Sequence, residues 1–359
     1  MSVAAAPDPT GLRPAGVGRR SRSGAWPLRA AGLLASILLT FFGLLAITFV
    51  IGRVVPIDPV LAIVGDRALP QVYARVRQEL ALDEPIYVQF WIYLSHVLSG
   101  DFGTSVLTSR PVLEDILRFF PATIELATLA TLMGVLVGVP LGVLGATHHG
   151  RWPDHLIRIV GLIGYSVPVF WLGLVGLLIL YARLDLVAGP GRLDVYYEDI
   201  VDPVTGLLLL DAALAREWEV FANAVSHIAL PASILGYFSL AYVSRMTRSF
   251  MLEQLRQEYI ITARAKGVGE ARVVWRHALG NVMLPLITVI ALSYASLLEG
   301  AVLTETVFAW PGLGRYITDS LFNVDMNAVL GGTIVVGAVF IGLNLLSDML
   351  YRLLDPRAR

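Results

Sequence analysis

Six long stretches of this chain contain no charged side chain, and they constrain the fold more than any other feature. They cover residues 31–52, 126–147, 159–182, 228–244, 281–298 and 326–347. Each has 17 to 24 residues, close to the ~20 residues that an α-helix needs to cross a bilayer core. Only 15% of the chain is charged, against about 25% in soluble domains. The pattern predicts an all-α polytopic membrane protein with six transmembrane helices.

The six runs divide the chain into a short tail and one transmembrane domain. Residues 1–30 are rich in Pro, Gly, Ala and Arg, which predicts a disordered basic cytoplasmic tail. A secretory signal is the alternative, but no convincing cleavage site follows the first apolar run. The transmembrane domain covers 31–359, and we place its helices at about 31–52, 122–147, 158–182, 227–246, 280–303 and 326–350. The many glycines suit close helix packing.

The distribution of lysine and arginine predicts the orientation of the chain. Four segments predicted to be cytoplasmic carry 17 of these residues, and they are 1–30, 148–158, 245–276 and 351–359. Three segments predicted to be outside are longer but carry only 10, and they are 53–121, 183–226 and 305–325. Because short basic loops stay on the cytoplasmic side, both termini are predicted to be cytoplasmic.

The first outer loop is too long for a simple turn. Residues 71–82 and 85–98 have the pattern of short amphipathic helices, and the second has an aromatic-rich face made by Tyr87, Phe90, Trp91, Tyr93 and Leu94. The two helices are expected to form a small cap or to lie in the membrane interface.

A polar segment at 256–279 separates the fourth and fifth spans. Residues 261–266 are rich in helix formers, and Gly267 and Gly269 then break or turn the helix. Residues 270–278 can begin a second short helix. Two short basic helices hinged at glycine predict a docking surface on the inner side of the membrane. An ordinary basic cytoplasmic loop is the alternative, since such loops are common between spans.

Several functional classes are disfavoured by what the sequence lacks. Without cysteine, the chain has no disulfide, no thiolate nucleophile and no Cys-based metal site. Fingerprints for binding dinucleotides or nucleotide phosphates are missing, so any ATP is bound by another chain. His148, His149 and His155 lie near the first inner loop, but arginines are interleaved with them, which favours a basic loop over a metal site.

Two other membrane classes remain as alternatives. A transporter driven by protons or sodium would carry ionisable groups at the midplane of its spans. A membrane-embedded enzyme would carry a metal-binding cluster or a nucleophile inside a span. The uncharged centres of all six runs favour neither class.

Eight motifs spread along the chain carry a family resemblance. They are ELALDEP at 79–85, GDFGTS at 100–105, RPV at 110–112, PATIEL at 121–126, SVPVFWLG at 166–173, TARAKGVGEARVVWRHAL at 262–279, TETVFAWPGLG at 304–314 and LDPR at 354–357. As a set they resemble the permease subunit of binding-protein-dependent ABC importers, in the branch that imports dipeptides, oligopeptides and nickel. The chain looks most like the first of that branch's two permeases.

This resemblance implies a type I ABC importer permease fold with a large extracytoplasmic loop after helix 1. It implies a multi-pass protein of the bacterial inner membrane that is not an enzyme and binds no cofactor. The implied partners are a second homologous permease, two cytoplasmic subunits that bind ATP and Mg²⁺, and an extracytoplasmic substrate-binding protein. Dipeptides or oligopeptides are the expected substrates, with nickel or another small solute as the alternative.

The resemblance also makes the polar segment an ATPase-coupling loop. Its candidate contact residues are Thr262, Ala263, Arg264, Ala265, Lys266, Gly267, Arg272, Trp275 and His277. Many importer permeases have a Glu-Ala-Ala triplet before the loop glycine, but this chain has Ile261-Thr262-Ala263 there. No role of a motif glutamate can therefore be carried over to this chain.

Other candidates lie in and after the fifth span. Glu299 lies deepest among the acids near the span edges, and a charge at membrane depth faces a cavity or a partner. Ser293, Tyr294 and Ser296 are further candidates for the translocation pathway, with hydrogen bonding between helices as the commoner explanation. A tight outer turn with an interfacial Trp is a candidate gate, formed by Trp310, Pro311, Gly312 and Gly314.

Overall fold

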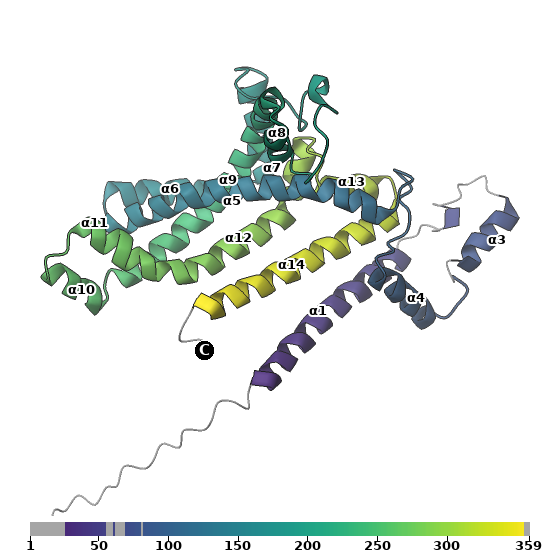
Figure 1. Cartoon of the computed structure of the whole chain (residues 1–359), viewed down its shortest axis with the longest axis horizontal. Helices are drawn as coiled ribbons and strands as arrows, with labels where there is room; N and C mark the ends of the chain where they lie inside the picture. The colour runs from purple at the N-terminus through teal and green to yellow at the C-terminus, as the bar shows by residue number, and fades with distance from the viewer. Residues whose placement is uncertain (1–25, 55–59, 62–68, 80–81, 355–359) are drawn as a thin grey trace, which may run out of the picture. The chain divides into compact units, whose positions relative to one another are not determined.

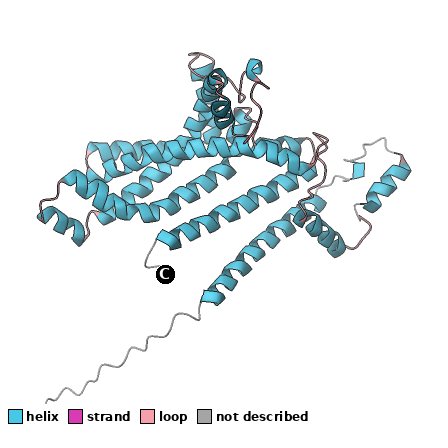
Figure 2. Ribbon diagram, viewed as in Figure 1, coloured by secondary structure: helices cyan, strands magenta, loops and turns pink. Residues whose placement is uncertain are grey.

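The computed structural model describes residues 26–54, 60–61, 69–79 and 82–354. Within these residues the chain is helical and has no strand (Figure 2). The predicted tail lies outside the described residues as far as residue 25. The elements are α1 (Trp26–Val54), α3 (Pro70–Glu79), α4 (Ile86–Leu98), α5 (Val112–Thr147), α6 (Trp152–Ser166), α7 (Val169–Gly176), η2 (Leu177–Tyr181), η3 (Val195–Tyr197), α8 (Leu208–Ala215), α9 (Trp218–Gln254), α10 (Glu258–Ala265), α11 (Glu270–Arg272), η4 (Val273–Ala278), α12 (Leu279–Val307), α13 (Leu313–Phe322) and α14 (Met326–Leu354).

The chain forms two compact units, Met1–Gly43 and Leu44–Arg359, and the boundary falls within α1. In the first unit the described part of α1 is a regular apolar helix, in which Thr40 donates to the carbonyl of Ser36 over 2.9 Å. The second unit holds every other element, with α5, α9, α12 and α14 as its long helices (Figure 1). Among the described helices, five are long and apolar enough to cross a membrane, and a bent pair makes a sixth if it counts as one span.

The most extensive helix–helix contact in the described part of the chain is that of α5 with α9, and glycines allow the two helices to approach closely. Gly134, Gly138 and Gly142 recur every four residues and so lie on one face of α5. A Cβ atom at Gly142 would lie 2.6 Å from the Cβ of Thr247 and 2.7 Å from the carbonyl oxygen of Ser244, both on α9. Small residues let the two backbones approach closely, as the abundance of glycine predicts.

The bent pair consists of α6 and α7, and Pro168 lies at the break between them. Pro140, Pro231 and Pro285 lie inside continuous helices, whereas Pro168 separates α6 from α7, which meet at an angle of 97°. Val167 is extended, with φ −95° and ψ 126°, because a proline disfavours helical geometry in the residue before it. The sequence predicts a single span at 158–182, but the structure breaks that segment into two helices.

The predicted helices of the first outer loop are present as α3 and α4. The aromatic residues of α4 do not share one environment. Phe90 and Tyr93 pack against Phe49 of α1, with ring centroids 5.3 and 5.5 Å apart. Tyr87 and Trp91 are exposed, which leaves an aromatic surface suited to the membrane interface.

Candidate functional site

The segment from α10 to η4 begins with a helix that is closed by a glycine. Gly267 has φ +78°, in the left-handed region that glycine adopts without strain. Its N–H donates to the carbonyl of Arg264 over 2.9 Å, and the N–H of Val268 donates to that of Ala263 over 3.1 Å. This pair of bonds is the Schellman arrangement, which ends a helix and reverses the chain. The structure thus confirms the predicted break at Gly267, and α11 starts immediately after Gly269.

Buried apolar side chains fasten this segment to the long helices. Ile260, Val273 and Ala278 are fully buried and belong to one cluster with Met251 of α9 and Leu286 of α12. Because a packed cluster resists deformation, a force on the segment is transmitted to both long helices.

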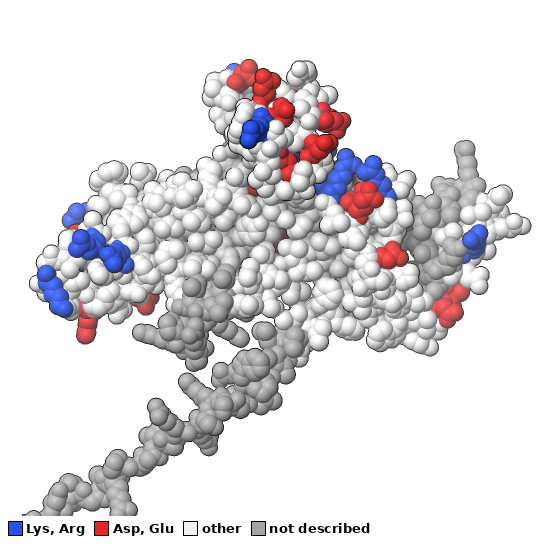
Figure 3. Space-filling view, in the orientation of Figure 1, with Lys and Arg blue, Asp and Glu red and all other residues white. Residues whose placement is uncertain are grey.

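The opposite side of the segment is exposed and carries most of the candidate contact residues. Thr262, Arg264, Ala265, Lys266, Gly267, Arg272 and Trp275 are exposed, and Ala263 and His277 are half-buried. Figure 3 shows Lys and Arg side chains gathered at this end of the molecule. Ile261 and Trp275 are 59% and 52% exposed. Large apolar side chains exposed among cations are typical of a surface that another protein covers.

One of these cations already has a partner within the segment. Arg264 donates to the Glu270 carboxylate from Nη2 over 2.6 Å and from Nε over 3.1 Å. Both side chains are largely exposed, so the pair contributes at most about 1 kcal/mol to stability. Its role is geometric, because it ties α10 to α11 across the glycine turn. Among the candidate cations, Lys266 and Arg272 have no such intrachain partner within the described residues.

The four candidate pathway residues on α12 divide into two pairs. Ser293 is buried and its hydroxyl lies 3.1 Å from that of Ser239 on α9. Tyr294 is half-buried and its hydroxyl lies 3.2 Å from that of Thr128 on α5. These two hydroxyls join neighbouring helices. Ser296 and Glu299 instead lie on the exposed side of α12.

The candidate outer turn is built around a buried carboxylate. Glu305 is fully buried and accepts hydrogen bonds from the Thr123 hydroxyl over 2.6 Å and from the N–H of Arg315 over 2.9 Å. A Cβ atom at Gly312 would collide with this carboxylate, and one at Gly314 would lie 2.9 Å from it. The two glycines therefore let the start of α13 fold closely over Glu305, where its N–H groups favour a negative charge.

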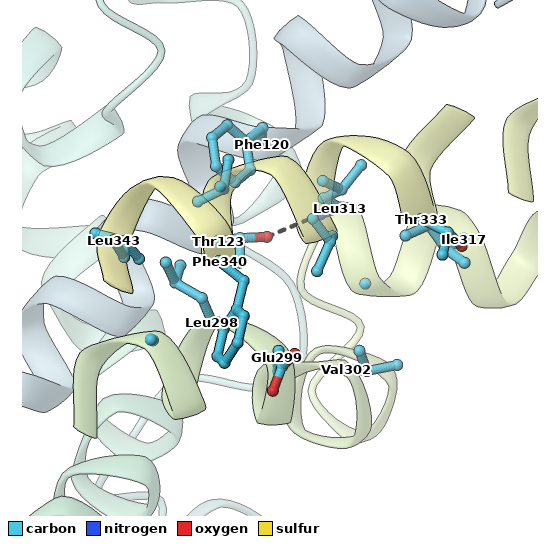
Figure 4. A pocket seen from close by; sticks show the side chains of 14 residues that line it. Phe120, Thr123, Leu298, Glu299, Val302, Leu313, Ile317, Thr333, Phe340 and Leu343 are labelled. Atoms are coloured by element: carbon cyan, nitrogen blue, oxygen red, sulfur yellow. Dashed lines mark hydrogen bonds between the residues drawn. The ribbon is translucent and has the colours of Figure 1, made fainter. Parts of the chain in front are cut away.

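Trp310 is buried inside the protein and is not the exposed interfacial residue that the sequence suggests. Only 1% of it is exposed, and its Nε1 donates to the carbonyl of Ala122 over 3.0 Å. Thr123 also accepts from the N–H of Leu313 over 2.8 Å (Figure 4). The turn after α12 is thus bound to α5. Burial with a satisfied indole N–H depends on a long-range neighbour that local pattern does not reveal.

An ion pair that sequence reasoning missed holds the loop between η2 and α9, which is predicted to lie outside the membrane, against α5. Arg192 donates from Nη2 to the Glu125 carboxylate over 2.6 Å and to the carbonyl of Gly206 over 2.9 Å. Glu125 also accepts from the N–H of Leu209 over 2.7 Å. The guanidinium lies 5.8 Å from the ring centroid of Trp310. The signal available in the sequence was Glu125 in the PATIEL motif. An acid that is nearly buried needs a cation, so Glu125 could have prompted a search for its partner.

Replacing Arg192 by alanine is expected to release this loop. The change leaves Glu125 buried without its cation, which costs about 3 kcal/mol. Hydrogen–deuterium exchange of the peptide containing Leu209, read by mass spectrometry, is expected to accelerate. Arg183→Ala, at an exposed arginine of the same loop, is the matched control and should leave exchange unchanged. Equal protection in both variants would show that the ion pair does not hold the loop.

A second cluster that sequence reasoning missed joins the loop after α4 and the start of α5 to α13 and the turn before α14. Asp325 is fully buried and accepts from the Ser105 hydroxyl over 2.5 Å. Tyr316 donates to the Asp115 carboxylate over 3.1 Å. Burial raises the pKa of the Tyr316 phenol and the nearby Asp115 charge raises it further, so the phenol keeps the proton that it donates. Ser105 lies in the GDFGTS motif, but nothing in the local sequence indicates its partner.

The end of the molecule that is predicted to be cytoplasmic has its own ion pair. Asp154 of α6 is fully buried and accepts from Arg248 of α9 at Nε over 2.5 Å and at Nη2 over 2.8 Å. His149 Nδ1 lies 3.3 Å from the same carboxylate. Among the described residues, no group of three or more His, Cys, Asp or Glu side chains could hold a metal ion.

Comparisons with known proteins agree with one another. The family model described as "Binding-protein-dependent transport system inner membrane component" matches residues 138–359, and the model of the N-terminal part of such components matches residues 29–127. The "Probable D,D-dipeptide transport system permease protein DdpB" of Escherichia coli (strain K12) is 47% identical over 324 residues, covering 89% of this chain and 94% of that protein. The "Di/tripeptide transport system permease protein DppB" of Pseudomonas aeruginosa is 42% identical over 332 residues, covering 92% and 97%.

A solved structure, "Inward facing conformations of the MetNI methionine ABC transporter", aligns with a TM-score of 0.49 at 16% sequence identity. The alignment covers 67% of this chain and 96% of that chain.

Proposed function

The chain belongs to the family of binding-protein-dependent transport system inner membrane components, and we propose that it forms half of a translocation pathway for dipeptides and oligopeptides. It is a multi-pass permease subunit of the bacterial inner membrane. Two relatives that match almost the whole chain are named for the transport of D,D-dipeptides, as a probable function, and of di- and tripeptides. These names favour peptides over the nickel alternative.

We propose that the segment from α10 to η4 is the coupling loop. This proposal rests on one observation, which is that one side of the segment is buried and the other is exposed. One side is buried against α9 and α12 through Ile260 and Val273, and the other exposes Trp275 and Lys266. An ATPase subunit that binds the exposed side would move α9 and α12 together. The pathway would then open alternately to each side of the membrane.

The proposed assembly supplies what this chain lacks. It contains a second homologous permease, two cytoplasmic ATP-binding subunits and an extracytoplasmic binding protein. ATP and Mg²⁺ bind to the ATPases, and no cofactor is assigned to this chain. A stand-alone transporter driven by protons or sodium is the remaining alternative, and it would require none of these subunits.

Purification in mild detergent, followed by mass spectrometry, tests the proposal. We expect this chain to co-purify with a second permease and with ATPase subunits. When reconstituted in liposomes with the binding protein, the assembly should accumulate a radiolabelled dipeptide only when ATP is available to the ATPases. Recovery of the chain alone, with peptide uptake that needs no ATP, would overturn the proposal in favour of secondary transport. ATP-dependent uptake of nickel without peptide uptake would replace the substrate.

A further inference from the structure

One face of α12 is exposed and carries polar as well as apolar side chains. Its exposed positions in the second half of the helix include Leu292, Ser296, Glu299, Leu303 and Thr306. They follow one another at intervals of four and three residues, which places them in one stripe. The exposed side chains of α7 and η2, by contrast, are apolar and include Phe170, Trp171, Leu174 and Leu178. A face that meets lipid is apolar, so the polar positions of this stripe are suited to water, a polar solute or the proposed second permease.

Glu299 is the charged residue of this stripe. It lies eight residues before the end of α12, which is roughly 12 Å along the helix axis. Among the described residues, no hydrogen bond or ion pair engages its carboxylate. Glu305, six residues further on, is by contrast buried and hydrogen-bonded. A carboxylate at membrane depth faces water or pairs with a cation, and the described residues supply no cation for Glu299.

An apolar cavity lies directly beside Glu299. Its volume is about 120 Å³, and it lies between α12 and α14, with α5 and α13 completing the wall. Figure 4 shows Glu299 with Phe340 on one side of it and Val302 on the other. Leu298, Ile317 and other apolar side chains complete most of the lining, and Glu299 is the charged group at its edge. A cavity of roughly this size with an apolar lining can take up a benzene-sized group.

We propose that Glu299 binds the α-ammonium group of the peptide in transit, and that the adjoining cavity receives the apolar side chain of the peptide's first residue. In a peptide the α-ammonium group and the first side chain are bonded to the same Cα atom. The Glu299 carboxylate and the cavity are likewise next to each other, so one residue of the substrate can reach both. A metal cation fits less well, because it needs several oxygen, nitrogen or sulfur ligands and this site offers one carboxylate. The site rests on the proposed peptide-import function and defines the substrate end that the permease recognises.

The absence of cysteine from the chain makes the charge at this position directly testable. The test measures ATP-driven uptake of leucyl-alanine by the complete assembly in liposomes, with partner subunits whose cysteines have been replaced. We expect Glu299→Gln and Glu299→Cys to lower uptake by about tenfold or more while ATP hydrolysis persists. Modification of the introduced thiol with a negatively charged ethylsulfonate reagent should restore uptake. Modification with a positively charged trimethylammonium reagent should not.

Leu292→Cys is the matched control, because Leu292 lies on the same exposed stripe and is apolar. Its two adducts should support equal uptake. Equal uptake with both adducts of the Glu299→Cys variant, or normal uptake by Glu299→Gln, would overturn the assigned site while leaving peptide import intact. If the unmodified assembly fails to transport leucyl-alanine or any other dipeptide, the proposed function is wrong, and the assigned peptide site is wrong as well.

The cavity is tested separately through the side chain of the substrate. Val336→Trp on α14 places a large ring at the cavity wall. We expect the ratio of leucyl-alanine uptake to glycyl-alanine uptake to fall by about tenfold. The tryptophan ring would fill the space that the leucine side chain needs, whereas an N-terminal glycine has no side chain to place in the cavity. An unchanged ratio in a variant that still transports glycyl-alanine would show that the cavity does not receive the first side chain.

Discussion

Replacing Gly267 by valine is expected to leave the chain in the membrane and abolish coupled transport. A β-branched residue at φ +78° is strained by about 1–3 kcal/mol. Apart from Gly267 itself and its two chain neighbours, no residue has an atom within 4 Å of the position that a Cβ would occupy, so the strain acts on the backbone and not through a clash. We expect the closing bonds from Gly267 and Val268 to be lost and α11 to be redirected relative to α10. The measurement compares ATP hydrolysis with ATP-driven peptide uptake in liposomes.

The matched control lies two residues away in the same turn. Gly269 is exposed and has open space around it, but its φ is −59°, which any residue adopts. Gly269→Val is therefore expected to keep most of the transport activity. If Gly267→Val transports normally, the turn is not needed for coupling. If both variants fail equally, the loop tolerates no side chain on this side and the backbone explanation is wrong.

Replacing Glu305 by alanine is expected to destabilise the turn between α12 and α13 and its packing against α5. The Thr123 hydroxyl and the N–H of Arg315 would lose their acceptor in a fully buried place. We expect a loss of about 3 kcal/mol in the free energy of unfolding. Thermal unfolding of the purified chain in detergent, followed by tryptophan fluorescence, measures this change.

Two further variants separate this explanation from a general effect of losing a charge. Glu253→Ala removes an exposed glutamate near the end of α9 and should leave the unfolding temperature unchanged. Gly312→Ala keeps Glu305 but puts a Cβ in the place of its carboxylate, so it should destabilise the outer turn as well. An unfolding temperature like that of the wild type in Glu305→Ala would mean that the buried carboxylate does not hold the turn.

Much of the architecture follows from local sequence. The uncharged runs predict a helical membrane protein, and the family models confirm the importer permease that the motifs indicate. Gly267 and Gly269 mark where the polar segment turns, and the structure places a helix on each side of them. Helical propensity, glycine geometry and run length depend on neighbours in sequence, so a single chain reveals them. The orientation of the termini and the exact spans stay predictions.

The contacts that complete the candidate sites were decided by the tertiary structure alone. The pairing of Arg192 with Glu125 joins residues 67 positions apart, and the contact between Trp310 and Ala122 joins residues 188 apart. Ser293 and Ser296 have the same chemistry in sequence, yet packing buries the first and exposes the second. The sequence by itself determined which segments are helical and apolar, and which residues could carry charge into the membrane. Only the packing of the helices decided which of those charges are neutralised within the chain and which, like Glu299, have no partner among the described residues.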